Sequence, residues 1–210
     1  MTDETIVVPG RGRVTVEPDL ASVRLGVAVT RPTATEAREA AATTMTAILA
    51  AVAASGVERK DIRTALVGLS PVTDYSSERG PRVTGYQLTN AVEVTVRRLA
   101  TVGALIDEGL AAGATSLDGL DFRLADPTAA ETEARQAAVV DARRRAETLA
   151  GAAGRTIGPV TGIVEGQQPP VGPLPRGPIA AMAMKAEADT PVEAGSQDVV
   201  VSVVVTFALD

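Results

Sequence analysis

The near absence of aromatic side chains constrains the fold of this chain more than any other feature of its sequence. Of 210 residues, 45% are hydrophobic, but only 2% are aromatic. The aromatic residues are Tyr75, Tyr86, Phe122 and Phe207. The interior therefore has to be built from Val, Leu, Ile and Ala, and the chain is long enough to bury a sizeable core of them. With 22% charged residues, the composition is that of a globular protein rather than a disordered one.

Alternation of apolar and polar residues predicts the β-strands. In residues 23–29 every second residue is apolar, which is the period of a half-buried strand. The last strand differs, because Val200, Val204 and Ala208 make its second face apolar as well. We expect that strand to be central in a sheet and covered on both sides. The predicted strands are residues 6–16, 20–30, 62–69, 83–97, 117–125, 158–165 and 198–209, with a polar loop at 73–82.

A period of 3.6 residues predicts three helices. The first has one apolar face, made by Ala37, Ala41, Met45, Ile48 and Val52. Thr33 and Glu36 have the spacing of a capping box at its start, and Gly56 stands where it should stop. The second helix is predicted over 99–112. The third begins near Asp126, with Pro127 at its first position, and runs to about Gly154.

These elements together predict an α+β fold, a mainly antiparallel sheet with helices packed on one face. We expect a single domain over residues 1–210 with an irregular insert at 167–196. That insert holds six of the 13 prolines and two of the four methionines, Met182 and Met184. A long irregular stretch with adaptable methionine side chains is a candidate surface for a protein partner or a second subunit, or a disordered loop without a role.

Composition excludes several kinds of site. The chain has no Cys and no His, so a thiol nucleophile, a disulfide, an imidazole base and the commonest zinc sites are absent. A net charge of −6 argues against a nucleic-acid partner. No segment has the length of a membrane span, and no signal peptide is evident. We expect no cofactor, no metal and no catalytic residues, and hence no enzyme.

Three consecutive arginines, Arg143 to Arg145, are the densest positive charge in the chain. On a helix they spread over roughly 200°, so they cannot form one basic patch. Acidic residues at helical spacing neutralise them: Asp141 precedes Arg144 and Arg145, and Glu147 follows Arg143 by four. We interpret the segment as a solvated amphipathic helix. Its apolar stripe is predicted to be Ala134, Ala138, Ala142, Ala146, Leu149 and Ala153, small enough to approach a sheet closely.

Other short motifs offer weak candidates. The Gly-x-Gly of residues 9–13 lacks a following helix, so a bend or bulge is expected there rather than a phosphate loop. Paired carboxylates occur at Asp118 and Asp121 and in the Asp-Glu-Gly of 107–109, and such pairs can hydrolyse glycosides or bind metal. Lys60 and Lys185 have no serine at an activating spacing. Asn90 interrupts the apolar face of its strand, through either a bulge or a side-chain bond to backbone.

Four segments, in order, resemble the SIMPL-domain family. They are the strand pair "VPGRGRVTVEPDLASVRLGV", the turn "SGVERKDIRT" with Asp61, the strand and helix "GYQLTNAVEVTVRRLATVGALID" with Asn90 and Asp107, and the long helix "EARQAAVVDARRRAETLAGAAGRTIGPV". The resemblance implies a bacterial envelope or periplasmic protein linked to oxidative-stress defence. It also implies an oligomer, because the family includes a periplasmic immunogenic protein that assembles into a ring. The family's name comes from an animal member that associates with a signalling kinase, and no catalytic residues are carried over.

The sequence therefore favours a non-enzymatic, oligomeric assembly or interaction protein, with homo-oligomerisation and a partner surface in the 167–196 insert. The alternative is a hydrolase using paired carboxylates, or a binder of a small ligand in a cleft between sheet and helices. The family resemblance predicts the periplasm or cell envelope. A cytoplasmic location is expected instead if the missing signal peptide is genuine.

Overall fold

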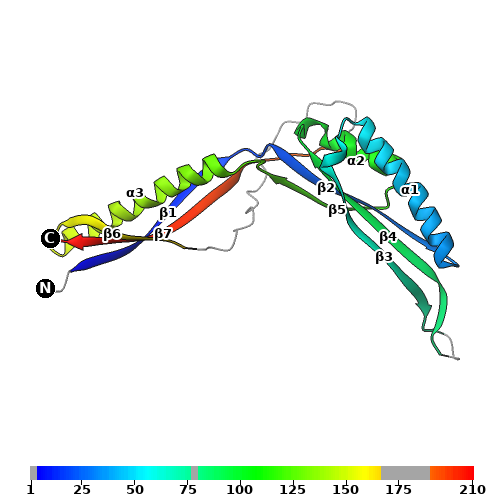
Figure 1. The fold of residues 1–210 in the computed structure, drawn as a ribbon, viewed down its shortest axis with the longest axis horizontal. Coiled ribbons are helices and arrows are strands. Elements are labelled where there is room, and N and C mark those ends of the chain that lie inside the picture. The colour runs from blue at the N-terminus through cyan, green and yellow to red at the C-terminus, as the bar shows by residue number, and fades with distance from the viewer. Residues whose placement is uncertain (1–3, 77–79, 167–189) are drawn as a thin grey trace. The chain divides into compact units, whose positions relative to one another are not determined.

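A computed structural model describes residues 4–76, 80–166 and 190–210 (Figure 1). Within these residues the helices are α1 (Ala34–Ala54), α2 (Val102–Ala111) and α3 (Thr128–Ala152), with the short 3₁₀ helices η1 (Arg59–Asp61) and η2 (Leu99–Thr101). The strands are β1 (Thr5–Val16), β2 (Leu20–Arg31), β3 (Ile62–Asp74), β4 (Arg82–Val96), β5 (Ser116–Arg123), β6 (Ile157–Glu165) and β7 (Gln197–Leu209). All predicted elements are present. The strand β3 continues to Asp74, so the expected polar loop at 73–82 is shorter than predicted.

The strands form two antiparallel sheets, with the orders β1-β7-β6 and β3-β4-β2-β5. The α+β class with antiparallel pairing is confirmed, although the strands are divided between two sheets rather than joined in one. The chain clusters correspondingly into two compact units. Unit 1 contains described residues 4–17, 124–166 and 195–210, and unit 2 contains 18–76, 80–123 and 190–194. The expectation of a single domain over 1–210 stays a prediction.

In unit 1, α3 packs along β1 and β7 through a row of alanines (Figure 1). The buried row is Ala130, Ala134, Ala138, Ala142, Ala146 and Ala150. The prediction of Leu149 and Ala153 at its C-terminal end is wrong, because Leu149 is 55% exposed and Ala150 takes its place. Residues four apart drift by about 40° around the axis at each step, so the contact row slants across the helix instead of running straight.

The Gly-x-Gly of β1 is explained by this close packing. A Cβ atom at Gly10 or Gly12 would overlap the carbonyl oxygens of Ala138 or Ala134 in α3. The expected bend or bulge is wrong, since β1 pairs with β7 without interruption from Thr5 to Val16. The glycines are therefore sites where the helix backbone lies directly on the strand.

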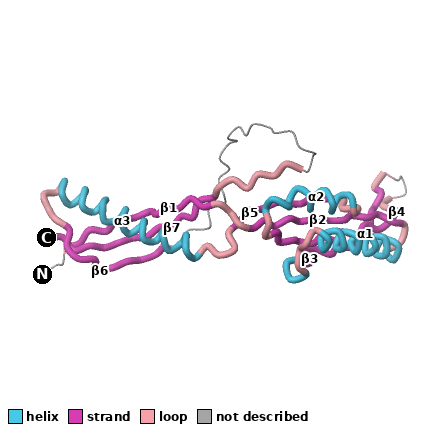
Figure 2. Tube along the Cα trace, turned by 90° about the horizontal axis from the view of Figure 1, so that it is seen from above, coloured by secondary structure: helices cyan, strands magenta, loops and turns pink. Residues whose placement is uncertain are grey.

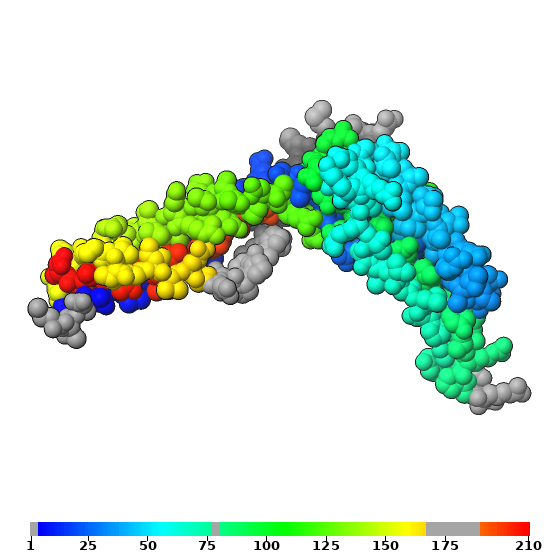
Figure 3. Space-filling model, in the orientation of Figure 1, coloured from blue at the N-terminus to red at the C-terminus, as the bar shows by residue number. Residues whose placement is uncertain are grey.

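The strand β7 is central in its sheet, as predicted, but only one of its faces is covered. Val201, Val203, Val205 and Phe207 are buried beneath α3. On the opposite face Val204 is 39% exposed, so the expectation of cover on both sides is wrong for this unit. Figure 3 shows that β6, in yellow, is also open to solvent beside α3.

In unit 2, α1 and α2 lie on the same side of the four-stranded sheet (Figure 2). The capping box of α1 is confirmed: the Glu36 amide donates to the Thr33 hydroxyl, and the Thr33 amide donates to the Glu36 carboxylate, both at 3.2 Å. All five predicted core residues of α1 are buried, and Gly56 adopts φ +83° after its last turn. These helices cover β2 and β4, whereas the edge strand β3 leaves Val67 63% exposed and Leu69 49% exposed.

Candidate functional site

The three arginines of α3 do not form a basic patch. Asp141 accepts hydrogen bonds from Arg144 and Arg145 at 2.8 Å each. The guanidinium of Arg143 lies over the ring of Phe207, 5.5 Å from its centroid, instead of making the expected pair with Glu147 in this described helix. The ion pairs and the stacked arginine fit an amphipathic helix with solvated charges. That the protein binds no nucleic acid stays a prediction.

A polar depression of about 140 Å³ lies on the face of the unit 2 sheet that the helices do not cover. Its lining residues are Ser22, Arg24, Glu93, Asp118, Gly119, Asp121 and Arg123, from β2, β4 and β5. Each strand places alternate residues on this face, because the intervening ones fill the core. The sequence pattern indicates Asp118 and Asp121 as candidates but not Glu93, since charged residues on the outer face of a strand are ordinary.

Glu93 is the centre of the charges in this depression. It is only 7% exposed, and its carboxylate accepts hydrogen bonds from Arg63 at 2.7 Å and from Arg24 at 3.4 Å. Burial alone would raise the pKa of Glu93, but the hydrogen bonds from Arg63, Ser22 and Arg24 outweigh it and hold the pKa below its ordinary value. Glu93 is therefore ionised near neutral pH and has no proton to donate to a leaving group.

The structure brings Asp118 and Asp121 into the same depression. Asp121 pairs across the sheet with Ser22, and Asp118 lies at a shift of register between β2 and β5, where it accepts a hydrogen bond from Ser116 at 2.9 Å. Arg24 and Arg123 lie among these carboxylates, so positive and negative charges alternate. In the described part of the chain, no three acidic side chains are grouped so that they could hold a metal ion.

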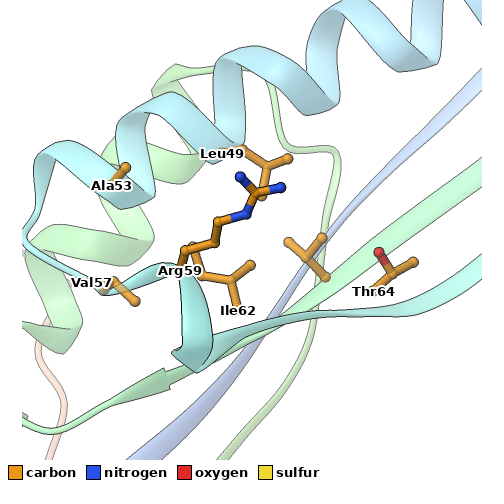
Figure 4. Close-up of a pocket in the computed structure, with 7 residues that line it drawn as sticks. Leu49, Ala53, Val57, Arg59, Ile62 and Thr64 are labelled. Atoms are coloured by element: carbon orange, nitrogen blue, oxygen red, sulfur yellow. The ribbon is translucent and has the colours of Figure 1, made fainter.

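A second hollow in unit 2 is apolar. It is a cleft of about 380 Å³ between α1 and β3, lined by Leu49, Ala53, Val57, Arg59, Ile62, Thr64 and Val92 (Figure 4). It exists because α1 lies over β2 and β4 and leaves the edge strand β3 uncovered. A cleft between sheet and helices was expected from the sequence only in general terms. Its residues could not be chosen, because Leu49 and Ala53 are on the flank of α1 rather than in its predicted apolar row.

The remaining candidate residues have structural partners or are not described. The Asp107 carboxylate accepts hydrogen bonds from the Thr190 amide at 2.9 Å and from the Thr190 hydroxyl at 2.6 Å. These bonds hold the pKa of Asp107 below its ordinary value. Lys60 pairs with Glu58 at 2.8 Å. Met182, Met184 and Lys185, like most of the 167–196 insert, lie outside the described residues.

Several residues of the family-like segments also build the fold. Asp61 accepts two hydrogen bonds from the guanidinium of Arg97, at 2.8 and 3.1 Å. A Cβ atom at Gly85 would lie 2.8 Å from the carbonyl oxygen of Arg31, so this glycine lets β4 approach β2. The expectation for Asn90 is wrong. It does not lie at a bulge of its own strand, and its side chain makes no hydrogen bond to backbone in the described structure. Its buried Oδ1 atom lacks a hydrogen-bond partner within the described structure.

Among the described residues, no helix combines the length and the apolar character needed to cross a membrane.

Known bacterial proteins are similar to this chain over most of its length. The 26 kDa periplasmic immunogenic protein of Brucella melitensis biotype 1 is 35% identical over 210 residues, which cover 97% of this chain and 84% of that protein. The uncharacterized protein YggE of Escherichia coli K12 is 31% identical over 158 residues, which cover 75% of this chain and 64% of YggE. The SIMPL family model, described as a protein of unknown function (DUF541), matches residues 6–207, and the chain therefore belongs to the SIMPL family.

Proposed function

We propose that this chain is a non-enzymatic protein of the bacterial cell envelope that assembles with copies of itself and contributes to stress defence. The observation that carries the proposal is the apolar face of the β1-β7-β6 sheet that α3 does not cover. On it Val7 is 59% exposed, Val164 is 65% exposed and Val204 is 39% exposed. Soluble proteins seldom leave large apolar patches exposed unless the patch meets a partner.

The strand register places these valines together. Val204 pairs with Val164 of β6 on one side and with Pro9 of β1 on the other, so all three residues share one face. Farther along the same face, Arg13 forms an ion pair with Asp198. A patch with an apolar half and a half of balanced charge can pack against its own copy across a two-fold axis. A second copy of this chain is therefore the proposed occupant.

The chemistry of the polar depression supports a role without catalysis. Glu93 is held ionised by two arginines, and Asp118 and Asp121 lie beside Arg24 and Arg123. Carboxylate catalysis of glycoside hydrolysis needs one carboxyl group that keeps its proton near neutral pH. The hydrogen bonds from the arginines hold the pKa of Glu93 below its ordinary value, so the most buried carboxylate of the depression does not keep a proton, which argues against the hydrolase alternative.

Location and physiological role rest on the relatives. The Brucella protein is named as periplasmic, which supports the envelope for this chain. Oxidative-stress defence follows only from the resemblance to the family. A strain without the gene should then survive peroxide less well than its parent, and equal survival would contradict this part of the proposal.

The assembly is tested by one charge on the open face. Val204→Arg should lower the sedimentation coefficient toward that of a monomer, because an arginine at the centre of the patch has no partner and loses its water on assembly. Val140→Arg is the matched control, since Val140 lies on α3 and is 67% exposed. If both variants assemble like the parent protein, the open face is not the interface.

The insert supplies the competing interface. Residues 169–188 belong to none of the described helices and strands, so their removal deletes no part of these elements. If this deletion abolishes assembly while Val204→Arg does not, the interface belongs to the insert, as the methionines at 182 and 184 suggested.

A further inference from the structure

The apolar cleft between α1 and β3 is the place where the core of unit 2 opens to solvent. Val92 at its base is only 3% exposed and belongs to the main core of this unit. Leu49 and Ala53 of α1 line one side, and Ile62 and Thr64 of β3 line the other. Beyond the cleft the exposed side chains of Val67 and Leu69 continue the apolar surface along β3. The apolar surface that begins in the cleft therefore extends along β3.

The size and lining of this cleft are those of a ligand site. At about 380 Å³ its volume lies within the range of roughly 300–1,000 Å³ that is usual for small-molecule pockets. Such pockets are mainly apolar with few polar groups, which fix the orientation of the ligand. Here the polar groups of the side chains are the guanidinium of Arg59 and the hydroxyl of Thr64.

Arg59 gives the cleft its charge. Figure 4 shows its side chain extending from η1 toward Leu49, across the region between α1 and Ile62. Its neighbours are neutralised: Lys60 pairs with Glu58, and Arg63 pairs with Glu93. Within the described part of the chain, Arg59 makes no such ion pair. A cation beside an apolar cleft, without an acidic partner, is suited to an anionic group carried by an apolar ligand.

We propose that this cleft binds a free medium-chain fatty acid. The alkyl chain lies against Leu49, Ile62 and Val92 and displaces water from them, which favours binding in proportion to the apolar area that is buried. The carboxylate lies at Arg59, where a planar guanidinium donates two parallel hydrogen bonds to its oxygens. The cleft belongs to unit 2 and the open sheet face to unit 1. If the cleft bound no fatty acid, the proposed assembly would be unaffected, and if the protein did not assemble, the proposed ligand site would be unaffected.

Two substitutions, each with a matched control, test the two halves of the ligand. Arg59→Gln removes the anchor for the carboxylate, and Lys60→Gln removes the adjacent cation, which does not line the cleft. Ala53→Leu fills the cleft, and Ala50→Leu adds the same bulk to an exposed position of α1 outside it. Leucine and alanine both favour helix, so neither change should unfold α1. Circular dichroism and sedimentation of each variant confirm that fold and assembly are kept.

The probes are decanoate and its neutral counterpart decanol, titrated by calorimetry below the concentration at which decanoate forms micelles. The parent protein should bind decanoate at one site per chain, and more tightly than decanol. Arg59→Gln should weaken decanoate binding about tenfold, the low end expected for a charge-assisted hydrogen bond, and leave decanol binding unchanged. Ala53→Leu should weaken both ligands, whereas Lys60→Gln and Ala50→Leu should bind like the parent.

Several results would overturn the proposal. No heat and no change in amide NMR spectra with decanoate would remove the site altogether. Decanoate binding that Arg59→Gln leaves unchanged would remove the role of the carboxylate. Binding that survives Ala53→Leu but is lost when the open sheet face of unit 1 carries Val204→Arg would place the ligand on that face instead.

Discussion

The backbone amide of Arg11 in β1 donates a hydrogen bond of 3.0 Å to the carboxylate of Asp141 in α3. The same carboxylate accepts from Arg144 and Arg145. The hydrogen bonds from Arg144 and then from the Arg11 amide lower the pKa of Asp141 to about 2. This contact explains the arginine triplet. Arg144 and Arg145 keep the Asp141 carboxylate ionised, and that carboxylate joins α3 to β1.

The first prediction is a loss of stability in acid that depends on Asp141. Its folded pKa of about 2 lies below the ordinary value, so its contribution is complete above about pH 4 and is lost as the pH falls toward 2. A shift of this size corresponds to about 2 kcal/mol. Denaturant unfolding should show Asp141→Ala less stable than the parent at pH 6. The gap should narrow between pH 4 and 2, and a gap independent of pH would contradict the assignment.

The second prediction concerns the close contact of α3 with β1. Gly12→Ala should destabilise unit 1 by about 3 kcal/mol, because its Cβ atom would overlap the carbonyl oxygen of Ala134 and force the helix away. Gly151→Ala is the control, since the position is helical and the added Cβ would meet no atom within 4 Å apart from the neighbouring residues and nearby backbone of α3 itself. Alanine there should stabilise α3 by up to about 1 kcal/mol. Thermal melts that rank the two variants in the opposite order would show that the packing is wrong.

The third prediction concerns residues 190–194, which belong to the described part of the 167–196 insert. Asp107→Ala removes the acceptor of both Thr190 hydrogen bonds, so residues 190–194 should loosen from unit 2. Hydrogen exchange at the Thr190 amide should become about tenfold faster, the change expected when a charge-assisted bond is lost. Glu108→Ala, which removes an acceptor of the Ser55 hydroxyl instead, should leave that exchange rate unchanged. Equal rates in all three proteins would mean that the Asp107 contact does not hold the segment.

The fourth prediction is that Asn90 lowers stability. Its Oδ1 atom is buried without a partner in the described structure, on the core face of β4 between Leu88 and Val92. Asn90→Val should therefore raise the free energy of unfolding by about 1 kcal/mol, because an unpaired buried polar group is replaced by an apolar one. A clear loss of stability would reveal a polar partner for Asn90 and would make it a candidate binding residue.

Local features of this fold could be predicted from the sequence. The capping box of Thr33 and Glu36 and the buried row of α1 follow from spacing within one helix, and both are confirmed. The strands were found for the same reason, since alternation is a property of neighbouring residues. The α+β class follows from the order of these elements.

Pairing across long separations could not be predicted. β1 pairs with β7 at the far end of the chain, so the sequence does not reveal that two sheets form. The close approach of α3 to Gly12 and the exposure of Leu149 depend on where α3 crosses the strands. Helical spacing alone does not specify that position. The cleft at Arg59 likewise arises from what α1 fails to cover, and an uncovered strand leaves no pattern in the sequence.

Sedimentation velocity of the unaltered 210-residue chain from about one to tens of micromolar tests self-assembly most directly. The open face of Val7, Val164 and Val204 predicts a sedimentation coefficient that rises with concentration toward that of a closed oligomer. A single boundary with the coefficient of the 21.4 kDa monomer across the whole range would contradict the account.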